Sequence, residues 1–214
     1  MKKTLSILIA AAMVAPALAD HHKEDGFTPL FDGKTLDGWK ISTENPSTFS
    51  VEDGAIKAVG PRAHAFYAGN VHGGKFDDFE LRLDVKTLKN SNGGVYIHTE
   101  YQESGWPSKG YEVQVNNTHK DWKKTGGLYA IRDNKEPFKD GEWMKYRIVV
   151  KDKAIKIWVN DKQLVDYTED EGEERPKGME GRWLIPGGGT IGLQGHDPGS
   201  TIFYKNIRIK PLKK

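Results

Sequence analysis

The sequence predicts an all-β protein, an antiparallel sandwich or barrel, on two observations. After the first 19 residues, no long run of apolar residues has the three- and four-residue spacing of an amphipathic helix. Short stretches with strand-like alternation recur instead, and Gly, Asn, Asp and Pro separate them. Many short strands joined by turns are typical of two packed antiparallel sheets or of a closed barrel.

The predicted strands, in order, are residues 49–51, 55–59, 79–85, 94–99, 111–115, 127–131, 144–150, 154–159, 190–194 and 201–209. Glu52-Asp53-Gly54 predicts a tight hairpin turn, and residues 150–154 join another pair of strands. Three longer segments, 62–75, 118–125 and 169–189, are expected to be irregular, either as functional loops or as plain surface connections. We find no internal repeat and no linker that would divide the chain.

Residues 1–19 are expected to be a secretory signal peptide. Lys2 and Lys3 precede an apolar stretch that begins at Thr4, and Ala17-Leu18-Ala19 is a small-residue cleavage pattern. The alternative, a buried N-terminal helix, explains these features less well. We therefore expect residues 20–214 to form one periplasmic or secreted domain, with no membrane span after signal cleavage.

Charge and cysteine content narrow the class of partner. The 32 Lys and Arg side chains exceed the 30 Asp and Glu by two, and cleavage would remove Lys2 and Lys3 and leave 30 of each. This balance argues against nucleic acid or an anionic membrane as the main partner. The chain has no cysteine, which excludes disulfides and an anchor attached through cysteine.

Two neighbouring predicted strands carry unusual polar residues on one face. Residues two apart in a strand share a face, so Tyr96 and His98 are expected to point away from Val95 and Ile97. In the next strand, Glu112 and Gln114 share a face opposite Tyr111, Val113 and Val115. A phenol, an imidazole, a carboxylate and a carboxamide together predict the floor of a polar binding site.

A set of motifs along the chain resembles one known family. They are residues 26–39, Phe79-Glu80-Leu81, 90–98, 110–115, 125–129, Gly141-Glu142-Trp143, Ile191-Gly192-Leu193-Gln194 and Lys205-Asn206-Ile207. In this order they resemble the 3-keto-disaccharide hydrolase family over nearly the whole chain after residue 25. The resemblance implies a jelly-roll β-sandwich of the concanavalin A-like lectin/glucanase type, with the site on the concave face of a curved sheet.

The resemblance also implies an activity, namely cleavage of 3-keto-disaccharides or 3-keto-glycosides by an exported enzyme. A ketone at carbon 3 acidifies the hydrogen on carbon 2, so a base can form an enolate that expels the glycosidic oxygen from carbon 1. Water then adds to the resulting alkene. This route requires a base, a stabiliser for the enolate oxygen and a proton donor for the leaving group.

Glu112 and His98 are the expected acid–base pair, because both face the polar side by strand parity and histidine transfers protons near neutral pH. The alternatives are a structural ion pair of Glu112 with Arg or Lys, and a satisfied sheet histidine at position 98. His196, beside Asp197, would protonate the leaving group or would close a turn before Pro198.

Substrate-binding roles are expected for carboxamides and aromatics. Gln114 and Gln194 suit hydrogen bonds to sugar hydroxyls, while Tyr96 and Tyr129 could donate to an enolate oxygen or simply pack in the sheet. Trp106 lies in a loop beside Gly and Pro, where it would form a sugar platform or anchor the loop.

The metal requirement is left open by the sequence. No two histidines have zinc-motif spacing, but a composite divalent-metal site using His98, Glu112 or His196 could form in the folded chain. Cleavage after Ala19 would leave Asp20-His21-His22, a nitrogen set that suits Cu(II) or Ni(II), although a solvated leader is the simpler interpretation.

Two non-enzymatic readings remain beside the enzyme. One is a carbohydrate-binding module on the same sandwich, and the other is an envelope protein that recruits a partner through its edge strands. A titratable pair on the concave face favours an enzyme, whereas a binding module needs mainly aromatics, carboxamides and backbone groups.

Overall fold

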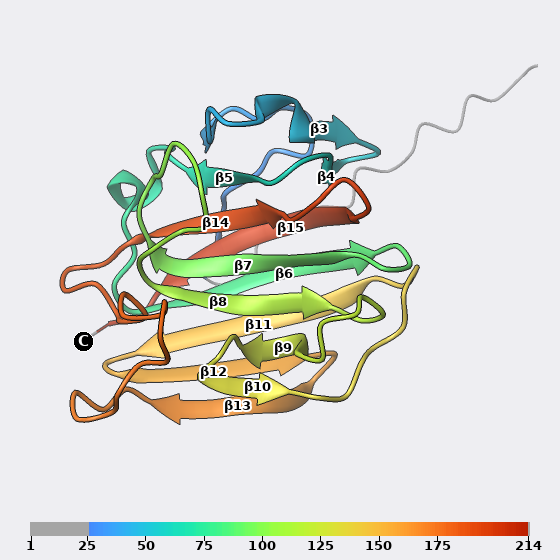
Figure 1. The fold of residues 1–214 in the computed structure, drawn as a ribbon. Helices are drawn as coiled ribbons and strands as arrows, with labels where there is room; N and C mark the ends of the chain where they lie inside the picture. The colour runs from blue at the N-terminus through green and yellow to red at the C-terminus, as the bar shows by residue number, and fades with distance from the viewer. Residues whose placement is uncertain (1–25, 214) are drawn as a thin grey trace, which may run out of the picture.

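The computed structural model describes residues 26–213, which form two antiparallel β-sheets packed face to face (Figure 1). Sheet A contains β1 (Thr28–Pro29), β3 (Phe49–Glu52), β4 (Ala55–Val59), β6 (Phe79–Thr87), β11 (Met144–Lys151), β12 (Ala154–Val159), β13 (Lys162–Thr168) and β15 (Thr201–Pro211). Sheet B contains β2 (Trp39–Ile41), β5 (Ala63–Tyr67), β7 (Asn92–Thr99), β8 (Tyr111–Asn116), β9 (Lys124–Leu128), β10 (Arg132–Asn134) and β14 (Thr190–Gly195).

The strand order confirms the predicted all-β sandwich of the concanavalin A-like type. Sheet A runs β13-β12-β11-β6-β15-β4-β3, with β1 paired to β15, and sheet B runs β10-β9-β8-β7-β14-β5-β2. Two short 3₁₀ turns, Pro46–Thr48 and Val71–Gly74, complete the regular structure. Within residues 26–213, no helix has the length and apolarity that crossing a membrane requires.

Alternate residues of both sheets meet in one core between the layers. Leu81, Leu83 and Val85 of β6 and Val95 and Ile97 of β7 are essentially inaccessible to solvent. Their strands belong to different sheets, so these side chains interdigitate across the sandwich as aligned sheet packing requires. The opposite face of sheet B is thereby left for the polar residues between them.

Both predicted hairpins form. Glu52 pairs with Ala55, and the two connecting residues, Asp53 and Gly54, have φ of 50° and 74°. Two consecutive positive φ values belong to a type I′ turn, whose twist matches that of the strands it joins. Lys151 pairs with Ala154 around the second turn.

Several strands differ from the predicted ones. β9 covers Lys124–Leu128 rather than 127–131, because Ala130, with φ of 62°, lies in the turn to β10. The glycine pair 126–127 inside β9 has low strand propensity and concealed the strand. β1, β2, β10 and β13 were not predicted.

The prediction that residues 62–75 are irregular is wrong for its first part, which forms β5. Ala63, Ala65 and Tyr67 join the core, yet His64 and Phe66 on the other face are buried as well. With both faces buried, the strand lacks the hydropathy alternation by which half-buried strands are recognised. The expected signal peptide and the Asp20-His21-His22 sequence lie outside the described residues and stay predictions.

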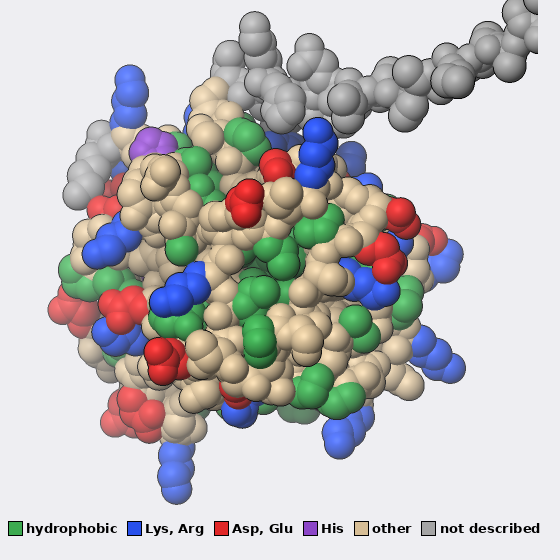
Figure 2. Space-filling model, turned by 90° about the horizontal axis from the view of Figure 1, so that it is seen from above, with side chains coloured by type: hydrophobic (Ala, Val, Ile, Leu, Met, Phe, Trp, Pro, Cys, Tyr) green, Lys and Arg blue, Asp and Glu red, His purple; other side chains and the backbone are tan. Residues whose placement is uncertain are grey.

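Charged side chains of both signs are interspersed with apolar ones over the face of the molecule shown in Figure 2. This mixture agrees with the nearly balanced charge of the chain.

Candidate functional site

Polar side chains from four adjacent strands gather on the face of sheet B that points away from the core. The strand pairing sets Tyr96 opposite Glu112 and Gln194 opposite His64. Tyr96 also lies opposite Gly192 of the strand that carries Gln194, so the two pairs are neighbours. Strands β8, β7, β14 and β5 thus bring together Glu112, Tyr96, Gln194 and His64, which we call the polar cluster.

A chain of hydrogen bonds connects three members of the polar cluster. The Tyr96 hydroxyl donates to Glu112 Oε2 at 2.8 Å, and Gln194 Nε2 donates to the Tyr96 oxygen at 3.2 Å. Each side chain is almost fully buried, with Glu112 retaining 6% exposure. The carboxylate is therefore held by the Tyr96 hydroxyl, which Gln194 in turn holds in place.

Arg182 completes the surroundings of Glu112, with its Nη2 3.7 Å from Glu112 Oε2. Arg182 lies in segment 169–189 and is fixed by hydrogen bonds to the carbonyl oxygens of Pro107 and Gly110. Its guanidinium is also 5.3 Å from the Tyr96 ring centroid. The alternative of a charge partner for Glu112 is thus present in the structure, although the two groups touch only loosely.

Burial raises the pKa of Glu112 above its ordinary value, and this effect outweighs Arg182, Tyr96 and Gln194, which all favour the charged form. Desolvation acts on the charged form, so the carboxylate takes up a proton more readily than one in water. A carboxylate whose pKa is shifted toward neutrality is suited to accept and return a proton.

Gly94 makes the room for this carboxylate. A Cβ atom at position 94 would lie 2.6 Å from Glu112 Oε1 and 2.7 Å from Glu112 Cγ. Both distances are below those that real Cβ atoms show, so the Glu112 side chain occupies the space above Gly94, which lies diagonal to it in the β7–β8 pair. The position of the carboxylate therefore depends on residue 94.

Gln114 lies beside Glu112 on β8, as its parity predicted. Its amide nitrogen is 3.3 Å from both Asn92 Oδ1 and the Lys123 carbonyl oxygen. Turning the amide by 180° places that nitrogen 2.9 Å from Gly93 O and 3.3 Å from Glu112 Oε1. In the second orientation Gln114 becomes a further donor to the carboxylate.

His98 is not brought together with Glu112, and the prediction that parity places both on one face is wrong. His98 has φ of 50°, which interrupts the alternation at the end of β7. Its ring stacks on Phe79 at 5.9 Å, its Nε2 is 2.8 Å from Asp77 O, and its Nδ1 accepts from Ile185 N. The structure therefore matches the alternative of a satisfied histidine, and burial lowers its pKa.

His196 and Trp106 lie at the His64 side of the polar cluster. His196 Nδ1 is 2.7 Å from Asp197 Oδ2, and the ring is 5.0 Å from that of Trp106. Asp197 also accepts from Gly199 N and Ser200 Oγ, so it closes the turn after β14. The turn-closing alternative is thus present in the structure through Asp197, while proton donation by His196 stays a prediction.

Tyr129 lies at the Glu112 side of the polar cluster. Its backbone nitrogen donates to Glu112 O, and Lys123 Nζ is 4.6 Å from its ring centroid. Burial raises the pKa of the Tyr129 phenol, with a smaller contribution from Glu112. Lys123 Nζ also lies over the ring of Trp122, which is 52% exposed. Tyr129 therefore borders the cluster on the side opposite Trp106.

His64 and Arg182 were not predicted as site residues. Both lie in segments expected to be irregular, and both reach the polar cluster only through strand pairing and loop packing. The one available signal was the short run Ala63-His64-Ala65-Phe66-Tyr67, in which small and aromatic residues surround a single imidazole.

Metal binding gains no support from the side-chain arrangement. Among residues 26–213, His, Asp and Glu side chains form no group of three or more that could hold a metal ion. A composite site that joins His98 to Glu112 is not assembled, because His98 faces Phe79.

A separate cavity of about 720 Å³ lies on the outer face of sheet A. Aromatic and basic side chains line it, among them Phe27, Trp158, Arg82, Arg147 and Arg208. Arg82 and Arg147 already pair with Glu80 there. Since Glu112 and its neighbours lie on the other sheet, this cavity is not part of the polar cluster.

The chain matches a known protein family over most of its length. The model of a family described as the 3-keto-alpha-glucoside-1,2-lyase-like domain matches residues 26–210. A 3-keto-disaccharide hydrolase from Bacteroides thetaiotaomicron is 28% identical to this chain, over 88% of the chain and 79% of the relative.

Solved structures give the same fold. A candidate glycosyl hydrolase from Parabacteroides distasonis superimposes with a TM-score of 0.68 and 27% identity, over 88% of this chain and 94% of that one. The carbohydrate-binding module CBM66 from Bacillus subtilis has a TM-score of 0.56 at 12% identity, over 81% and 95% of the two chains. At that identity the second likeness concerns the fold alone.

Proposed function

Because the chain belongs to the 3-keto-alpha-glucoside-1,2-lyase-like family, we propose that it cleaves 3-keto-glycosides or 3-keto-disaccharides by elimination followed by hydration. The observation that carries the proposal is the buried Glu112 carboxylate on the polar face of sheet B. Tyr96 holds this carboxylate, and burial raises its pKa. The name of the Bacteroides relative supports the same substrate class.

Glu112 is the proposed base. It takes the proton from carbon 2, and the electrons of that C–H bond form the enolate of the carbon-3 ketone. The enolate then expels the glycosidic oxygen from carbon 1. The oxygen departs with the electron pair of the broken C–O bond and takes up a proton. Water adds across the alkene between carbons 1 and 2, so the balance is hydrolysis.

The proton for the leaving group comes from Glu112 itself or from His196. Burial favours the protonated form of Glu112, which makes it able to return the proton it has taken. His196 is the second donor, since Asp197 fixes its Nδ1. Tyr96 keeps the carboxylate oriented and is a positioning residue in this scheme.

The test is incubation of the mature protein with 3-keto-lactose, 3-keto-trehalose and a 3-keto-glucoside, with release of reducing sugar measured with and without chelator. The matching unoxidised sugars should not be cleaved, because without the ketone the carbon-2 hydrogen is not acidic. A substrate deuterated at carbon 2 should react more slowly where proton removal limits the rate.

Glu112→Gln should lower turnover by roughly a hundredfold or more, as for a general base. The matched control is Glu100→Gln, since Glu100 pairs on the surface with Lys109. Equal cleavage of plain and 3-keto sugars would sink the elimination route. Binding of these sugars without any cleavage would leave the carbohydrate-binding module as the function.

We also propose that the protein is exported, on the pattern of residues 1–19. Cell fractionation with the natural leader, and N-terminal sequencing of the product, test this. Retention in the cytoplasm with Met1 intact would refute it.

A further inference from the structure

His64 is held deep in the sheet by its backbone and covered by aromatic rings. Its backbone nitrogen donates to Ser42 Oγ, and its carbonyl accepts from Ser42 N. The ring lies 5.6 Å from that of Tyr96 and 5.8 Å from that of Trp106, edge-on to both. The side chain is thus fixed in place and 1% exposed.

Three buried polar atoms at this position lack a hydrogen-bond partner. They are both ring nitrogens of His64 and the Oε1 atom of Gln194, which find no partner among the described residues. The two residues are directly opposite each other in the β5–β14 pairing. An unsatisfied buried polar atom destabilises the folded state, so three in one place are a substantial penalty. Such a penalty is expected where a ligand supplies the missing bonds.

The chemistry of these atoms selects the ligand. Burial and the nearby Arg62, His196 and Arg182 lower the pKa of His64 to about 3. At neutral pH the ring is therefore uncharged, with one nitrogen donating and the other accepting, while Gln194 Oε1 accepts. One donor and two acceptors complement hydroxyl groups, each of which donates and accepts. An anion would meet two acceptors and a single donor among these three atoms, and a cation would meet Arg62 and Arg182.

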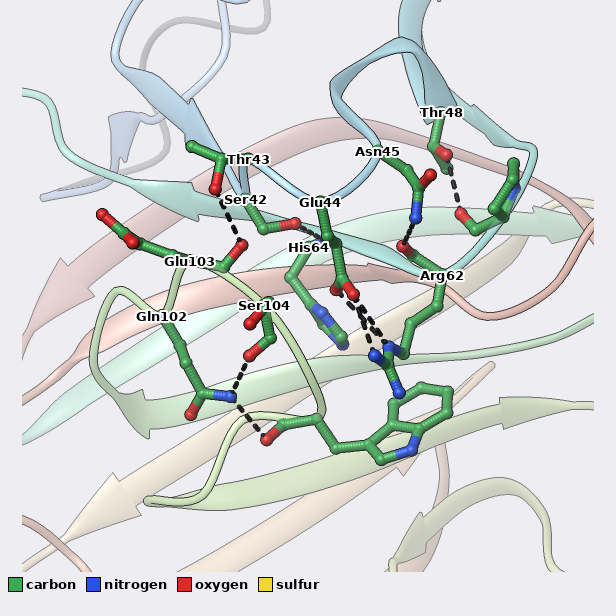
Figure 3. A network of polar contacts seen from close by, with 12 residues as sticks. Ser42, Thr43, Glu44, Asn45, Thr48, Arg62, His64, Gln102, Glu103 and Ser104 are labelled. Carbon is green, nitrogen blue, oxygen red and sulfur yellow. Dashed lines mark hydrogen bonds and ion pairs between the residues drawn. The ribbon is translucent and has the colours of Figure 1, made fainter.

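Trp106 covers this position. Its loop is tied down by Gln102 Nε2, which donates to Trp106 O at 2.9 Å, and by Glu103 O, which accepts from Thr43 Oγ1 and Glu44 N. Figure 3 shows Gln102, Glu103 and Thr43 near His64, with Glu44 bound to Arg62 beside it. The Arg62 guanidinium is 4.9 Å from the Trp106 ring centroid, and the indole is 44% exposed.

We propose that His64 and Gln194 form a subsite that binds neighbouring hydroxyl groups of the sugar. The indole of Trp106 covers this subsite and turns aside when the sugar binds. The inference rests on the proposed function, because it fixes which end of the substrate lies over β5 and β14. Glu112 lies on the other side of Tyr96, so a sugar bound at His64 extends across Tyr96 toward the carboxylate. His64 and Gln194 then orient the substrate without taking part in the proton transfer.

The first experiment compares His64→Phe with the wild type. Phenylalanine keeps the aromatic shape and removes both unsatisfied nitrogens, so the thermal midpoint should stay the same or rise. The value of kcat/KM on 3-keto-trehalose should fall about tenfold or more, mainly through KM, because hydroxyl bonds are lost. His72→Asn is the matched control, since His72 is exposed, has φ of 50°, and asparagine tolerates that conformation.

Deoxygenated substrates identify the hydroxyls. With the wild type, a 4-deoxy or 6-deoxy analogue that lacks the contacting hydroxyl should lower kcat/KM about as much as His64→Phe lowers it on the full substrate. With His64→Phe, the same analogue should lower kcat/KM little further. Full additivity for every analogue would overturn the subsite. So would an unchanged KM in His64→Phe, or a lower thermal midpoint with unchanged kinetics, because these mark a structural histidine.

A second measurement separates this inference from the proposed function. In protein with ¹⁵N-labelled histidine, the His64 resonances are those lost in His64→Phe. Trehalose or lactose at millimolar concentration should shift both nitrogens in the wild type, whether or not any 3-keto sugar is cleaved. If cleavage fails but the shifts occur, the proposed function is wrong and the subsite stands. If the shifts are absent, the subsite is wrong even where cleavage is found.

Discussion

Replacing Gly94 with alanine is expected to displace the Glu112 carboxylate without removing any of its atoms. Gly94 is not among the glycines with positive φ, so the β7 backbone accepts an alanine at this position. The new Cβ would, however, lie 2.6 Å from Glu112 Oε1 and 2.7 Å from its Cγ. The effect on activity therefore reports the position of the base and not the stability of the strand.

The size of the displacement follows from the contact distances. Ordinary van der Waals contact begins at 3.4 Å, so Cγ must move from 2.7 Å by about 0.7 Å. A misplacement of this order costs roughly a hundredfold in rate, or ~2.7 kcal/mol of transition-state stabilisation. Overpacking should cost about 1–3 kcal/mol of folding free energy, which leaves the protein folded at room temperature.

The assay is kcat and KM on 3-keto-trehalose, with the urea midpoint measured on the same preparation. Gly192→Ala is the matched control on the neighbouring strand, because its Cβ would meet nothing closer than the 3.3 Å contact with Tyr96 Cβ. We expect Gly94→Ala to lose kcat and Gly192→Ala to stay within a few-fold of the wild type. Near-normal kcat in a folded Gly94→Ala protein would refute the assignment of Glu112 as the base.

Two further predictions concern protonation. Tyr96→Phe removes a donor that favours the charged form of Glu112, so the pKa of Glu112 should rise further and the acidic limb of kcat/KM should move to higher pH. A limb that stays in place or moves to lower pH contradicts this. For His98, whose pKa is lowered by burial from 6.5, the folded state binds fewer protons than the unfolded state below about pH 6.5. Its contribution to stability is present above pH 6.5 and is lost as the pH falls toward its folded-state pKa. Urea titrations should therefore show a smaller acid loss of stability in His98→Phe than in the wild type. The variant should lose about 1–3 kcal/mol at pH 7 from the broken bonds to Asp77 and Ile185, with little change in kcat, and a hundredfold loss of kcat would contradict this structural role.

The sequence predicted the sandwich because its information is local. Alternation over residues 79–85 and 111–115 fixes which side chains enter the core, and that pattern persists whatever the neighbouring strands are. The Asp53-Gly54 turn is likewise determined by residues that accept positive φ. Glu112, Tyr96 and Gln194 could be assigned to a polar face for the same reason, since strand parity requires no knowledge of the pairing.

His98 shows where parity fails. A single residue with φ of 50° turns its ring from the polar face to Phe79, and nothing in the local sequence marks that turn. Histidine accepts positive φ more readily than most residues do, but this tendency is too weak to predict. The acid–base pair expected from positions 98 and 112 therefore becomes a single carboxylate with Tyr96, Gln194 and Arg182 around it.

What the sequence by itself determined is the strand periodicity, the polar face of β8 and the motifs of the family. What only the tertiary structure decided is which residues surround Glu112. His64 reaches the cluster because β5 pairs with β14, and Arg182 because its loop packs on Pro107 and Gly110. Both contacts join residues far apart in the chain, and the pairing that creates them depends on the energy of the whole sandwich. A local pattern of residues does not determine that energy, so these two neighbours can be identified only in the folded molecule.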